Sequence, residues 1–435
     1  MNNKNFILLK KKNNISGKIN IPGSKSISNR ILLISALSLG ITKIKNLLIS
    51  DDTLIMIKCL KKLGIKIKKK KKIFFVYGNF IKFLKKNVKL FVDNAGTLIR
   101  PLTSILSFMK GNYILYGSKR MNKRPIKDLV SSLNNIGMRI KYLKNNGFPP
   151  LLIKKGKIKT NIIKIKSNIS SQYLTSILIS SVLINKFKEI IIITNNNIVS
   201  NSYINITINL MKLFKVNVIK INNNVFKIIT KEKYISPGIV KIEGDLTSAS
   251  YFLASSVISK GPLKIKGIIK NSIQGDVKFL DILEDMGAKI NYQDNELEIY
   301  YNKIIKNFNI DCINFPDLAM TLLMLSLYSN NISLFKNLYS WNFKETNRLN
   351  AMKKELNKIG AKINIINRND ILVIPPKYIK SAFINTYNDH RIAMCFSLLS
   401  LNNINKLGSN ILIENPKCVF KTFPNYFKLF KKISK

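Results

Sequence analysis

The 435-residue chain contains one histidine, one tryptophan and four cysteines, and its 22 acidic residues are few beside 73 lysines and arginines. The cysteines (Cys59, Cys312, Cys395 and Cys418) are far apart, so the sequence offers neither CxxC metal spacing nor a disulfide scaffold. No apolar run reaches the ~18 residues that a membrane span needs. The opening MNNKNFILLKKKNN has too short an apolar part for a secretory signal. We therefore expect a protein of the reducing cytoplasm.

The formal net charge of +51 is the most unusual property of the composition. Charge alone suggests a partner such as nucleic acid or an anionic membrane surface. However, most of the basic residues are lysine, and Lys, Asn and Ile recur along the whole chain, which is typical of AT-rich codon usage. Runs such as KIKKKKKIFF then indicate solvated surface, and no basic stripe with interleaved aromatic residues is evident. Nucleic-acid binding stays an alternative that rests on charge alone.

Arginine is scarce, and its positions are therefore informative. Lysine serves where only charge matters, whereas planar, bidentate contact with carboxylate or phosphate needs arginine. Most of the eight arginines lie in or beside compact polar stretches: Arg30, Arg100, Arg120, Arg124, Arg139, Arg348, Arg368 and Arg391. Arg139 and Arg368 lie outside such stretches, and we expect them on the surface.

A repeat of about 74 residues runs through the chain. Four stretches, LKKLGIKI, LNNIGMRI, LEDMGAKI and LNKIGAKI, place glycines at 64, 137, 287 and 360, which are spaced by 73, 150 and 73 residues. Each stretch predicts the last turn of an amphipathic helix, a glycine stop and a strand. LMKLFKVNVI at 210–219 is a looser copy in the wide interval.

A second series interlocks with the first, because short β-rich runs lead into polar clusters that precede apolar helices. The clusters centre near residues 26, 97, 171, 247, 317 and 389. Both series predict six βαβα-type units with mixed sheets in an α/β (α+β) architecture. Ser, Thr, Asp and Asn in the clusters serve as helix caps. Several clusters also place Lys, Arg or Gln near helix N-termini, which attract anions.

Ten motifs in order resemble one family. They are PGSKSISNR, DNAGTLIRPL, KRPI, SSQYLTSIL, EGDLTSASYFLA, QGDVKFLDILEDMGAKI, FPDLAMT, KETNRL, YNDHRIAM and PKCVFKTFP. The match runs from about residue 16 to the C-terminus and is to the 5-enolpyruvylshikimate-3-phosphate synthases, the 3-phosphoshikimate 1-carboxyvinyltransferases of chorismate synthesis. The resemblance implies a two-domain inside-out α/β barrel, with three units per domain and a substrate cleft between domains. The domains would be 22–243, and 1–21 plus 244–435.

The family reaction moves the enolpyruvyl group of phosphoenolpyruvate to the 5-hydroxyl of shikimate 3-phosphate and releases phosphate. It proceeds by addition and elimination through a tetrahedral ketal. The resemblance implies two small-molecule substrates, no metal or organic cofactor, no nucleic-acid or membrane partner, and a monomer. The first domain would bind shikimate 3-phosphate, and the second would hold phosphoenolpyruvate and most of the catalytic groups.

The resemblance also assigns site residues. Catalytic roles fall to Lys25, Asp317, Glu345, Asp389 and His390. Contacts with shikimate 3-phosphate fall to Lys25, Ser26, Arg30, Ser170, Ser171, Gln172, Ser200, Tyr203, Asp317, Ser340 and Lys344. Contacts with phosphoenolpyruvate fall to Lys25, Gly96, Arg124, Gln172, Arg348, Arg391 and Lys421.

Several of these roles carry a physical expectation. Ser26 and Arg30 are four residues apart and would share a helix face, and the same spacing puts Lys344 on a face with Arg348. Asp317 would be the general base for the 5-hydroxyl, or the group that orients it. Glu345 would protonate the methylene carbon, and Asp389 and His390 would orient the proton-transfer groups.

The sequence departs from the family pattern at three places. Asn201 and Ser340 stand where the family usually has Lys and Asn, and Leu98-Ile99 stands for Ala-Met. An inactive relative is therefore an alternative.

A further rival is the UDP-N-acetylglucosamine enolpyruvyltransferase of the same fold. It has a Lys-Asn pair near its start and a reactive loop cysteine. Here Lys25 precedes Ser26, and no cysteine lies between Cys59 and Cys312.

Overall fold

A computed structural model describes residues 5–79, 85–167, 169–195, 198–293, 295–403 and 406–434. The chain forms two compact units, unit 1 over Met1–Gly23 and Glu243–Lys435 and unit 2 over Ser24–Ile242. These limits differ by one or two residues from the predicted domain limits. In the described ranges, no helix is both long enough and apolar enough to cross a membrane.

Within its described residues, unit 2 forms three four-stranded sheets. Their orders are β14-β3-β5-β4, β6-β7-β9-β8 and β10-β11-β13-β12. The strands are β3 (Ile41–Lys45), β4 (Lys66–Lys70), β5 (Ile73–Tyr77), β6 (Val88–Phe91), β7 (Asn112–Tyr116), β8 (Arg139–Tyr142), β9 (Leu151–Lys154), β10 (Ile162–Ile165), β11 (Glu189–Thr194), β12 (Val218–Lys220), β13 (Val225–Ile229) and β14 (Ile239–Lys241). One edge pair of each sheet is parallel and the other pairs are antiparallel, so the predicted mixed sheets are confirmed.

The described part of unit 1 also forms three sheets. Their orders are β1-β23-β22, β16-β17-β15-β2 and β18-β19-β21-β20. The strands are β1 (Phe6–Leu9), β2 (Gly17–Asn20), β15 (Leu263–Lys266), β16 (Lys289–Gln293), β17 (Glu296–Tyr300), β18 (Asn309–Asp311), β19 (Ser333–Lys336), β20 (Lys362–Ile366), β21 (Asp370–Ile374), β22 (Ala382–Ile384) and β23 (Ile411–Glu414). Each sheet again has one parallel pair, so three repeats per unit match the six predicted ones.

In lysine-rich strands, buried and exposed residues alternate, as in a sheet with one solvent-exposed face. In β3, Thr42 and Ile44 are buried, whereas Lys43 and Lys45 are exposed. Successive side chains of a strand point to opposite faces, so this pattern buries the apolar face and solvates the lysines. Arg139 and Arg368 are exposed, as predicted from their places outside the polar stretches.

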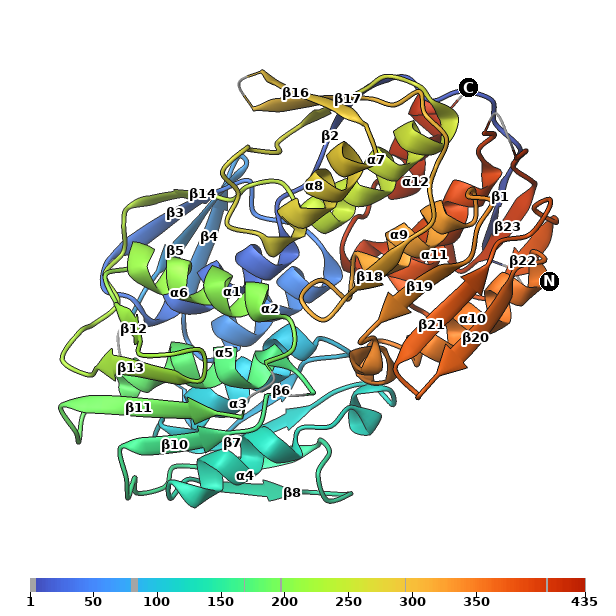
Figure 1. The fold of residues 1–435 in the computed structure, drawn as a ribbon. Helices are drawn as coiled ribbons and strands as arrows, with labels where there is room; N and C mark the ends of the chain where they lie inside the picture. Colours follow the sequence, from blue (N-terminus) through green and yellow to red (C-terminus); the bar gives the residue numbers. More distant parts are fainter. Residues whose placement is uncertain are drawn as a thin grey trace. The chain divides into compact units, whose positions relative to one another are not determined.

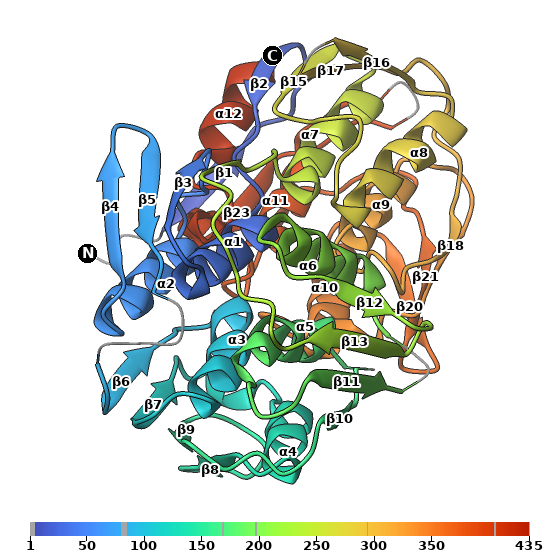
Figure 2. The ribbon, with the colours of Figure 1, turned by 90° about the vertical axis from the view of Figure 1, so that its left-hand side faces the viewer.

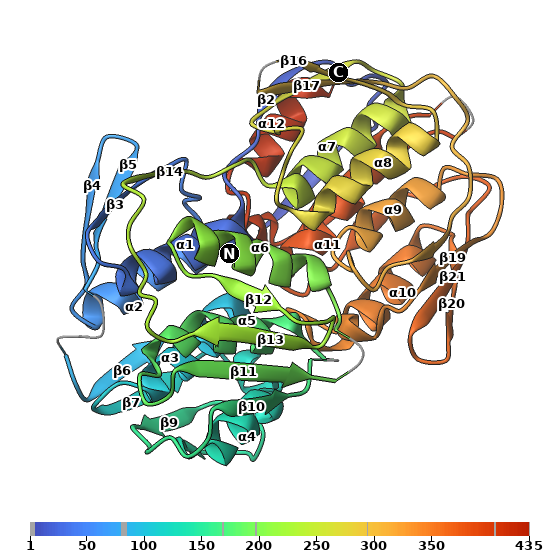
Figure 3. The ribbon, with the colours of Figure 1, turned by 60° about the vertical axis from the view of Figure 1, so that its left-hand side comes forward.

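The first helix of each repeat starts at a predicted polar cluster. These helices are α1 (Lys25–Leu37), α3 (Gly96–Ser107) and α5 (Ser171–Ser180) in unit 2, and α7 (Leu246–Ser259), α9 (Ala319–Ser326) and α11 (His390–Ser397) in unit 1. Every residue of α7, α9 and α11 is buried, including the polar residues His390 and Arg391 at the start of α11. In each unit these helices lie inside, with the sheets outside them (Figures 1, 2 and 3).

The second helix of each repeat is amphipathic, and the first five of these helices are each followed by a left-handed residue. These helices are α2 (Asp51–Lys62), α4 (Lys127–Asn135), α6 (Asn201–Leu213), α8 (Lys278–Asp285), α10 (Arg348–Lys358) and α12 (Tyr426–Ile433). The predicted glycine stops at 64, 137, 287 and 360 have φ of 98°, 100°, 99° and 93°, which favours glycine. In the looser copy Lys215 takes this conformation, with φ 65°. The helical ends predicted from the repeat are therefore confirmed.

Candidate active site

In unit 2, Arg30 is a buried cation whose hydrogen bonds in the described structure all go to neutral oxygens. Its Nε donates to Thr207 Oγ1 at 2.8 Å and its Nη2 to Thr175 Oγ1 at 3.3 Å. Its Nη1 and Nη2 also donate to the carbonyls of Ser26 and Tyr203. Burial lowers the pKa of Arg30 to about 10, and Tyr203 opposes this only in part. A guanidinium in such surroundings is suited to an incoming anion, since no carboxylate among these contacts offsets its charge.

Arg30 and Ser26 lie in α1, four residues apart, so the predicted shared helix face is confirmed. Lys25 is the first residue of the same helix, and its Nζ lies 3.8 Å from Oδ2 of the buried Asp52. Asp52 lies in the first turn of α2, where a helix N-terminus favours a negative charge. This arrangement holds the Lys25 ammonium at a helix start.

Gly96 leaves room for a compact group of polar side chains. It is the first residue of α3, and a Cβ at this position would lie 2.9 Å from Arg124 Nη2 and 3.0 Å from Gln172 Oε1. It would lie closer still to Arg100, whose Nη1 donates a hydrogen bond to Gln172 Oε1. Asn94 fixes the Arg124 side chain, because Arg124 Nη1 donates to the carbonyl oxygen and to Oδ1 of Asn94. The structure thus brings together Gly96, Arg124 and Gln172 of the predicted set.

The other predicted hydroxyl residues of unit 2 lie at two helix starts. Ser170 is the N-cap of α5, and its Oγ accepts from Gln172 N at 3.3 Å, while Ser171 is buried in the first turn. The Ser170 cap is the purely structural role expected of a cluster residue. Ser200 precedes α6 with φ 58°, and the Arg30 guanidinium lies 5.9 Å above the Tyr203 ring.

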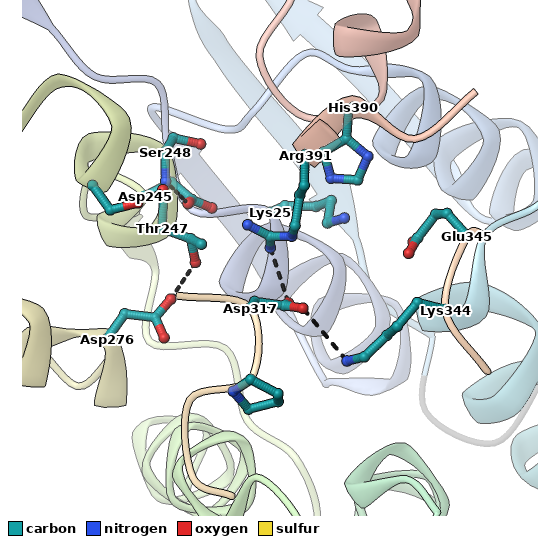
Figure 4. A network of polar contacts seen from close by, with 12 residues as sticks. Lys25, Asp245, Thr247, Ser248, Asp276, Asp317, Lys344, Glu345, His390 and Arg391 are labelled. Carbon is teal, nitrogen blue, oxygen red and sulfur yellow. Dashed lines mark hydrogen bonds and ion pairs between the residues drawn. The ribbon is translucent and has the colours of Figure 1, made fainter. Parts of the chain in front are cut away.

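In unit 1, Asp317 is the centre of a network of cations. Its Oδ2 accepts from Arg391 Nη2 at 2.9 Å, and its Oδ1 lies 2.8 Å from Arg348 Nη1 and 3.5 Å from Lys344 Nζ. The contacts of Asp317 with Arg391 and Lys344 can be followed in Figure 4. Burial by itself raises the pKa of Asp317, but Arg391, Lys344 and Arg348 outweigh it and hold the pKa well below the ordinary range. The carboxylate is therefore charged at neutral pH.

Arg348 connects three carboxylates. Its Nε and Nη2 contact Asp389, Nη1 contacts Asp317, and Nη2 also donates to Glu345 Oε2 at 3.1 Å. Burial lowers the pKa of this guanidinium, but the charges of Asp389, Glu345 and Asp317 outweigh burial and raise it above its ordinary value. Arg348 thus organises the acidic groups of this site.

The sixth polar cluster places Asp389, His390 and Arg391 at the start of α11. Asp389 is the N-cap and accepts from Arg391 N at 2.9 Å, while also contacting Arg348. Arg391 Nη1 donates to Tyr251 OH at 3.2 Å, and His390 is buried. Figure 4 shows the side chains of Arg391 and His390 extending from this helix start.

One expectation about this site was wrong. Lys344 does not share a helix face with Arg348, because Asn347 caps α10 and the helix begins only at Arg348. Lys344 lies in the preceding loop, after the turn η4 (Tyr339–Phe343), and reaches Asp317 from there. Burial lowers its pKa, and Asp317 opposes the shift.

The remaining predicted residues of unit 1 are largely buried. Ser340 lies in η4, and among the described residues its Oγ has no hydrogen-bond partner. Lys421 is a buried lysine at the end of the turn η6 (Pro416–Lys421). Glu345 is held by Arg348.

A carboxyl group that the sequence analysis gave no role lies near the start of α7. Asp276, in the turn η3 (Gly275–Val277), accepts a hydrogen bond from Thr247 Oγ1, as Figure 4 shows. Burial raises the pKa of Asp276 to about 7, and Thr247 opposes this only in part. The residue lies within the motif QGDVKFLDILEDMGAKI, but nothing in its local sequence indicates burial. Over the ranges that the structure describes, no group of three or more His, Cys, Asp or Glu could hold a metal ion.

Solved structures define the class of fold. An EPSP synthase from Acinetobacter baumannii, solved at 2.37 Å, superposes with a TM-score of 0.78 over 99% of this chain and 98% of its own, at 20% sequence identity. A second EPSP synthase structure from the same organism gives a TM-score of 0.77 over 98% of each chain. The predicted α/β fold class is therefore confirmed.

Sequence comparison identifies the family. The family model described as EPSP synthase (3-phosphoshikimate 1-carboxyvinyltransferase) matches residues 9–430. A 3-phosphoshikimate 1-carboxyvinyltransferase from Buchnera aphidicola subsp. Cinara cedri is 49% identical over 431 residues, which cover 98% of this chain and 97% of the relative. Its counterpart from Herminiimonas arsenicoxydans is 44% identical and covers 96% of this chain and 95% of the relative. The chain belongs to the EPSP synthase family.

The family confirms the predicted function of the chain, an enzyme of the transferase class that acts in aromatic amino acid biosynthesis. It supports 3-phosphoshikimate 1-carboxyvinyl transfer over the UDP-N-acetylglucosamine rival and over a binding protein defined by charge.

Proposed function

We propose that the chain transfers the enolpyruvyl group of phosphoenolpyruvate to the 5-hydroxyl of shikimate 3-phosphate through a tetrahedral ketal. The observation that supports this proposal most strongly is the Asp317 network, in which one carboxylate contacts Arg391, Arg348 and Lys344. Arginine forks match carboxylate and phosphate geometry. Such preorganised charges stabilise the negative charge of the intermediate without reorganising during the reaction.

Shikimate 3-phosphate binds chiefly to unit 2 in this proposal. The Arg30 guanidinium, held by neutral oxygens, receives an anionic group of the substrate. Ser26, Ser170, Ser171, Gln172, Ser200 and Tyr203 add donors at the starts of α1, α5 and α6. From unit 1, Lys344 binds the same substrate, and the Ser340 hydroxyl, which lacks a partner among the described residues, donates to it.

Phosphoenolpyruvate takes the remaining cations. Arg391, Arg348 and Lys421 of unit 1 bind its phosphate and carboxylate, together with Lys25, Arg124 and Gln172 of unit 2. Gly96 leaves room for Arg124 and Gln172, because a side chain there would displace them.

Proton transfer needs one group to take a proton from the 5-hydroxyl and one to protonate the methylene carbon. Asp317 is charged at neutral pH, so it accepts the hydroxyl hydrogen bond and orients this oxygen for attack. Glu345 and Lys25 transfer the protons. Asp389 and His390 orient these two proton-transfer side chains. The reverse transfer then expels phosphate. We propose a cytoplasmic monomer that needs no metal or organic cofactor.

The test is phosphate release with both substrates. We expect release only when both are present, and a loss of at least about 100-fold in Lys25→Ala and Arg391→Ala. Arg139→Ala, at an exposed arginine, is the matched control and should keep wild-type activity. Folded wild-type protein that releases no phosphate would contradict the proposal, and Asn201→Lys and Ser340→Asn would then test for a decayed relative.

A further inference from the structure

The turn that leads into α11 has an unusual backbone. Tyr387 and Asn388 have φ of 53° and 57°, and Asp389 N donates to Thr386 O at 2.8 Å, so residues 386–389 form a turn with two left-handed central residues. Such positions favour Gly, Asn and Asp, and a tyrosine is disfavoured there. Contacts outside the turn must therefore hold Tyr387 in place.

Glu355 supplies such contacts from α10. It is fully buried, and its Oε1 accepts from Tyr387 OH at 2.7 Å while its Oε2 accepts from Asn385 N at 3.0 Å. Arg348 lies seven residues earlier, about two helical turns, and therefore on the same side of α10. Arg348 binds Asp389, so one helix face fastens the turn at two points.

The second of these two points is the Glu355 carboxylate, whose charge is paired with a lysine. Lys358 Nζ lies 2.5 Å from Glu355 Oε2 and also donates to the Phe383 carbonyl at 3.0 Å. On the other side of the turn, Asn415 Nδ2 donates to Asn388 Oδ1 at 2.5 Å. A buried carboxylate that is paired and hydrogen-bonded in this way holds its partners in a single geometry.

We propose that Glu355 and Tyr387 are positioning residues, which set the orientation of Asp389, His390 and Arg391 relative to Arg348. This inference rests on the proposed function of those residues. Neither Glu355 nor Tyr387 is placed among the substrate contacts; they act through the turn. A displaced Arg391 would still bind an anion, but it would stabilise the transition state less well.

The decisive variant is Tyr387→Phe, which removes only the hydroxyl that contacts Glu355. Its matched control is Tyr378→Phe, the same change at a tyrosine of unit 1 that is 65% exposed. Glu355→Gln alters the other partner, and the double variant measures the coupling of the two residues. Thermal unfolding of every variant separates loss of fold from loss of position.

The single histidine provides a readout that needs no catalysis. Protein labelled with ¹³C at the histidine Cε1 gives one ring resonance, and it must come from His390. We expect Tyr387→Phe to shift this resonance and Tyr378→Phe to leave it in place. With both substrates, kcat should fall about tenfold in Tyr387→Phe at nearly constant KM. The double variant should lose no more than the stronger single one.

Two results would overturn the proposal. One is an unchanged His390 resonance and kcat in Tyr387→Phe; the other is a loss of kcat that equals the loss of folded protein. If Glu355→Gln does not fold, Tyr387→Phe decides alone. A wild-type protein that does not turn over the substrates would refute the proposed function, whereas the His390 resonance would still decide whether Tyr387 positions this turn.

Discussion

Arg30 of unit 2 and Arg348 of unit 1 are both buried arginines near the start of a helix, yet their surroundings are opposite. Arg30 donates to threonine hydroxyls and backbone carbonyls, whereas Arg348 contacts Asp389, Asp317 and Glu345. Burial lowers the pKa of Arg30 to about 10. Around Arg348 the carboxylates outweigh burial, and the pKa is raised.

The difference separates two functions of a buried cation. A guanidinium without a carboxylate partner lacks compensation for its lost hydration, and an anionic ligand can supply it. A guanidinium with three carboxylate partners already has its lost hydration compensated. It holds those carboxylates in the positions that the site needs. Arg30 is therefore the stronger candidate for direct anion binding, and Arg348 the stronger candidate for organising the site.

The largest effect should follow from breaking the Arg348 network. Arg348→Met leaves the fully buried Asp389 and its neighbour Asp317 without their shared partner. Removing one member of a buried ion pair costs about 3–5 kcal/mol. Urea unfolding should show this loss. Arg368→Met, at an exposed arginine, should change the unfolding free energy by less than about 0.5 kcal/mol. A loss below about 1 kcal/mol in Arg348→Met would contradict the organising role.

A carboxyl group outside the network should respond to pH in the opposite sense to Asp317. Burial raises the pKa of Asp276 to about 7, so the folded state binds this proton more tightly than the unfolded state does. The resulting stability is present in full below the unfolded pKa of about 4 and is lost as the pH rises to about 7. We expect wild type to lose about 4 kcal/mol over this window relative to Asp276→Asn. Parallel pH profiles of the two proteins from urea unfolding would refute this assignment.

These contrasts show what local sequence can encode. The glycine stops and the six polar clusters are local patterns, and the structure has them where they were predicted. Lys344 was misplaced because four-residue spacing defines a shared face only inside a helix, and α10 begins at Arg348, directly after its cap Asn347. The cap itself is a local signal that could have corrected the error.

Other features depend on contacts between distant segments and leave no local pattern. Asp276 is buried through its packing against α7, and its pKa follows from that burial. Tyrosine is not a residue type that favours the left-handed conformation, and Tyr387 is held in it by Glu355, which lies 32 residues away in the sequence. The contrast between Arg30 and Arg348 likewise arises from segments brought together by the fold.

Removing Arg30 should change binding more than stability. In Arg30→Met, Thr175 and Thr207 keep their mutual hydrogen bond, and Thr207 keeps its bond to the Tyr203 carbonyl. We expect the KM for shikimate 3-phosphate to rise about 30-fold, which corresponds to about 2 kcal/mol for hydrogen bonds to a charged group. The unfolding free energy should fall by less than about 1.5 kcal/mol. A large loss of stability with an unchanged KM would contradict this prediction. It would mean that Arg30 organises the structure of unit 2 and does not bind the substrate.

The smallest expected effect is at Gly96, where a side chain would meet the guanidinium groups of Arg100 and Arg124. In Gly96→Ala the new Cβ would lie 3.0 Å from Gln172 Oε1, 2.9 Å from Arg124 Nη2 and closer still to Arg100 Nη1, so the ends of these side chains must move aside. The backbone of Gly96 is helical, so alanine should leave stability unchanged or raise it by reducing the entropy of the unfolded chain. The displaced side chains should raise the KM for phosphoenolpyruvate about tenfold, through poorer geometry of the charged hydrogen bonds. The KM for shikimate 3-phosphate should change less, since Arg30 does not contact this group. Equal increases in both KM values would mean that Gly96 supports the shape of unit 2 and has no selective role in holding Arg124 and Gln172.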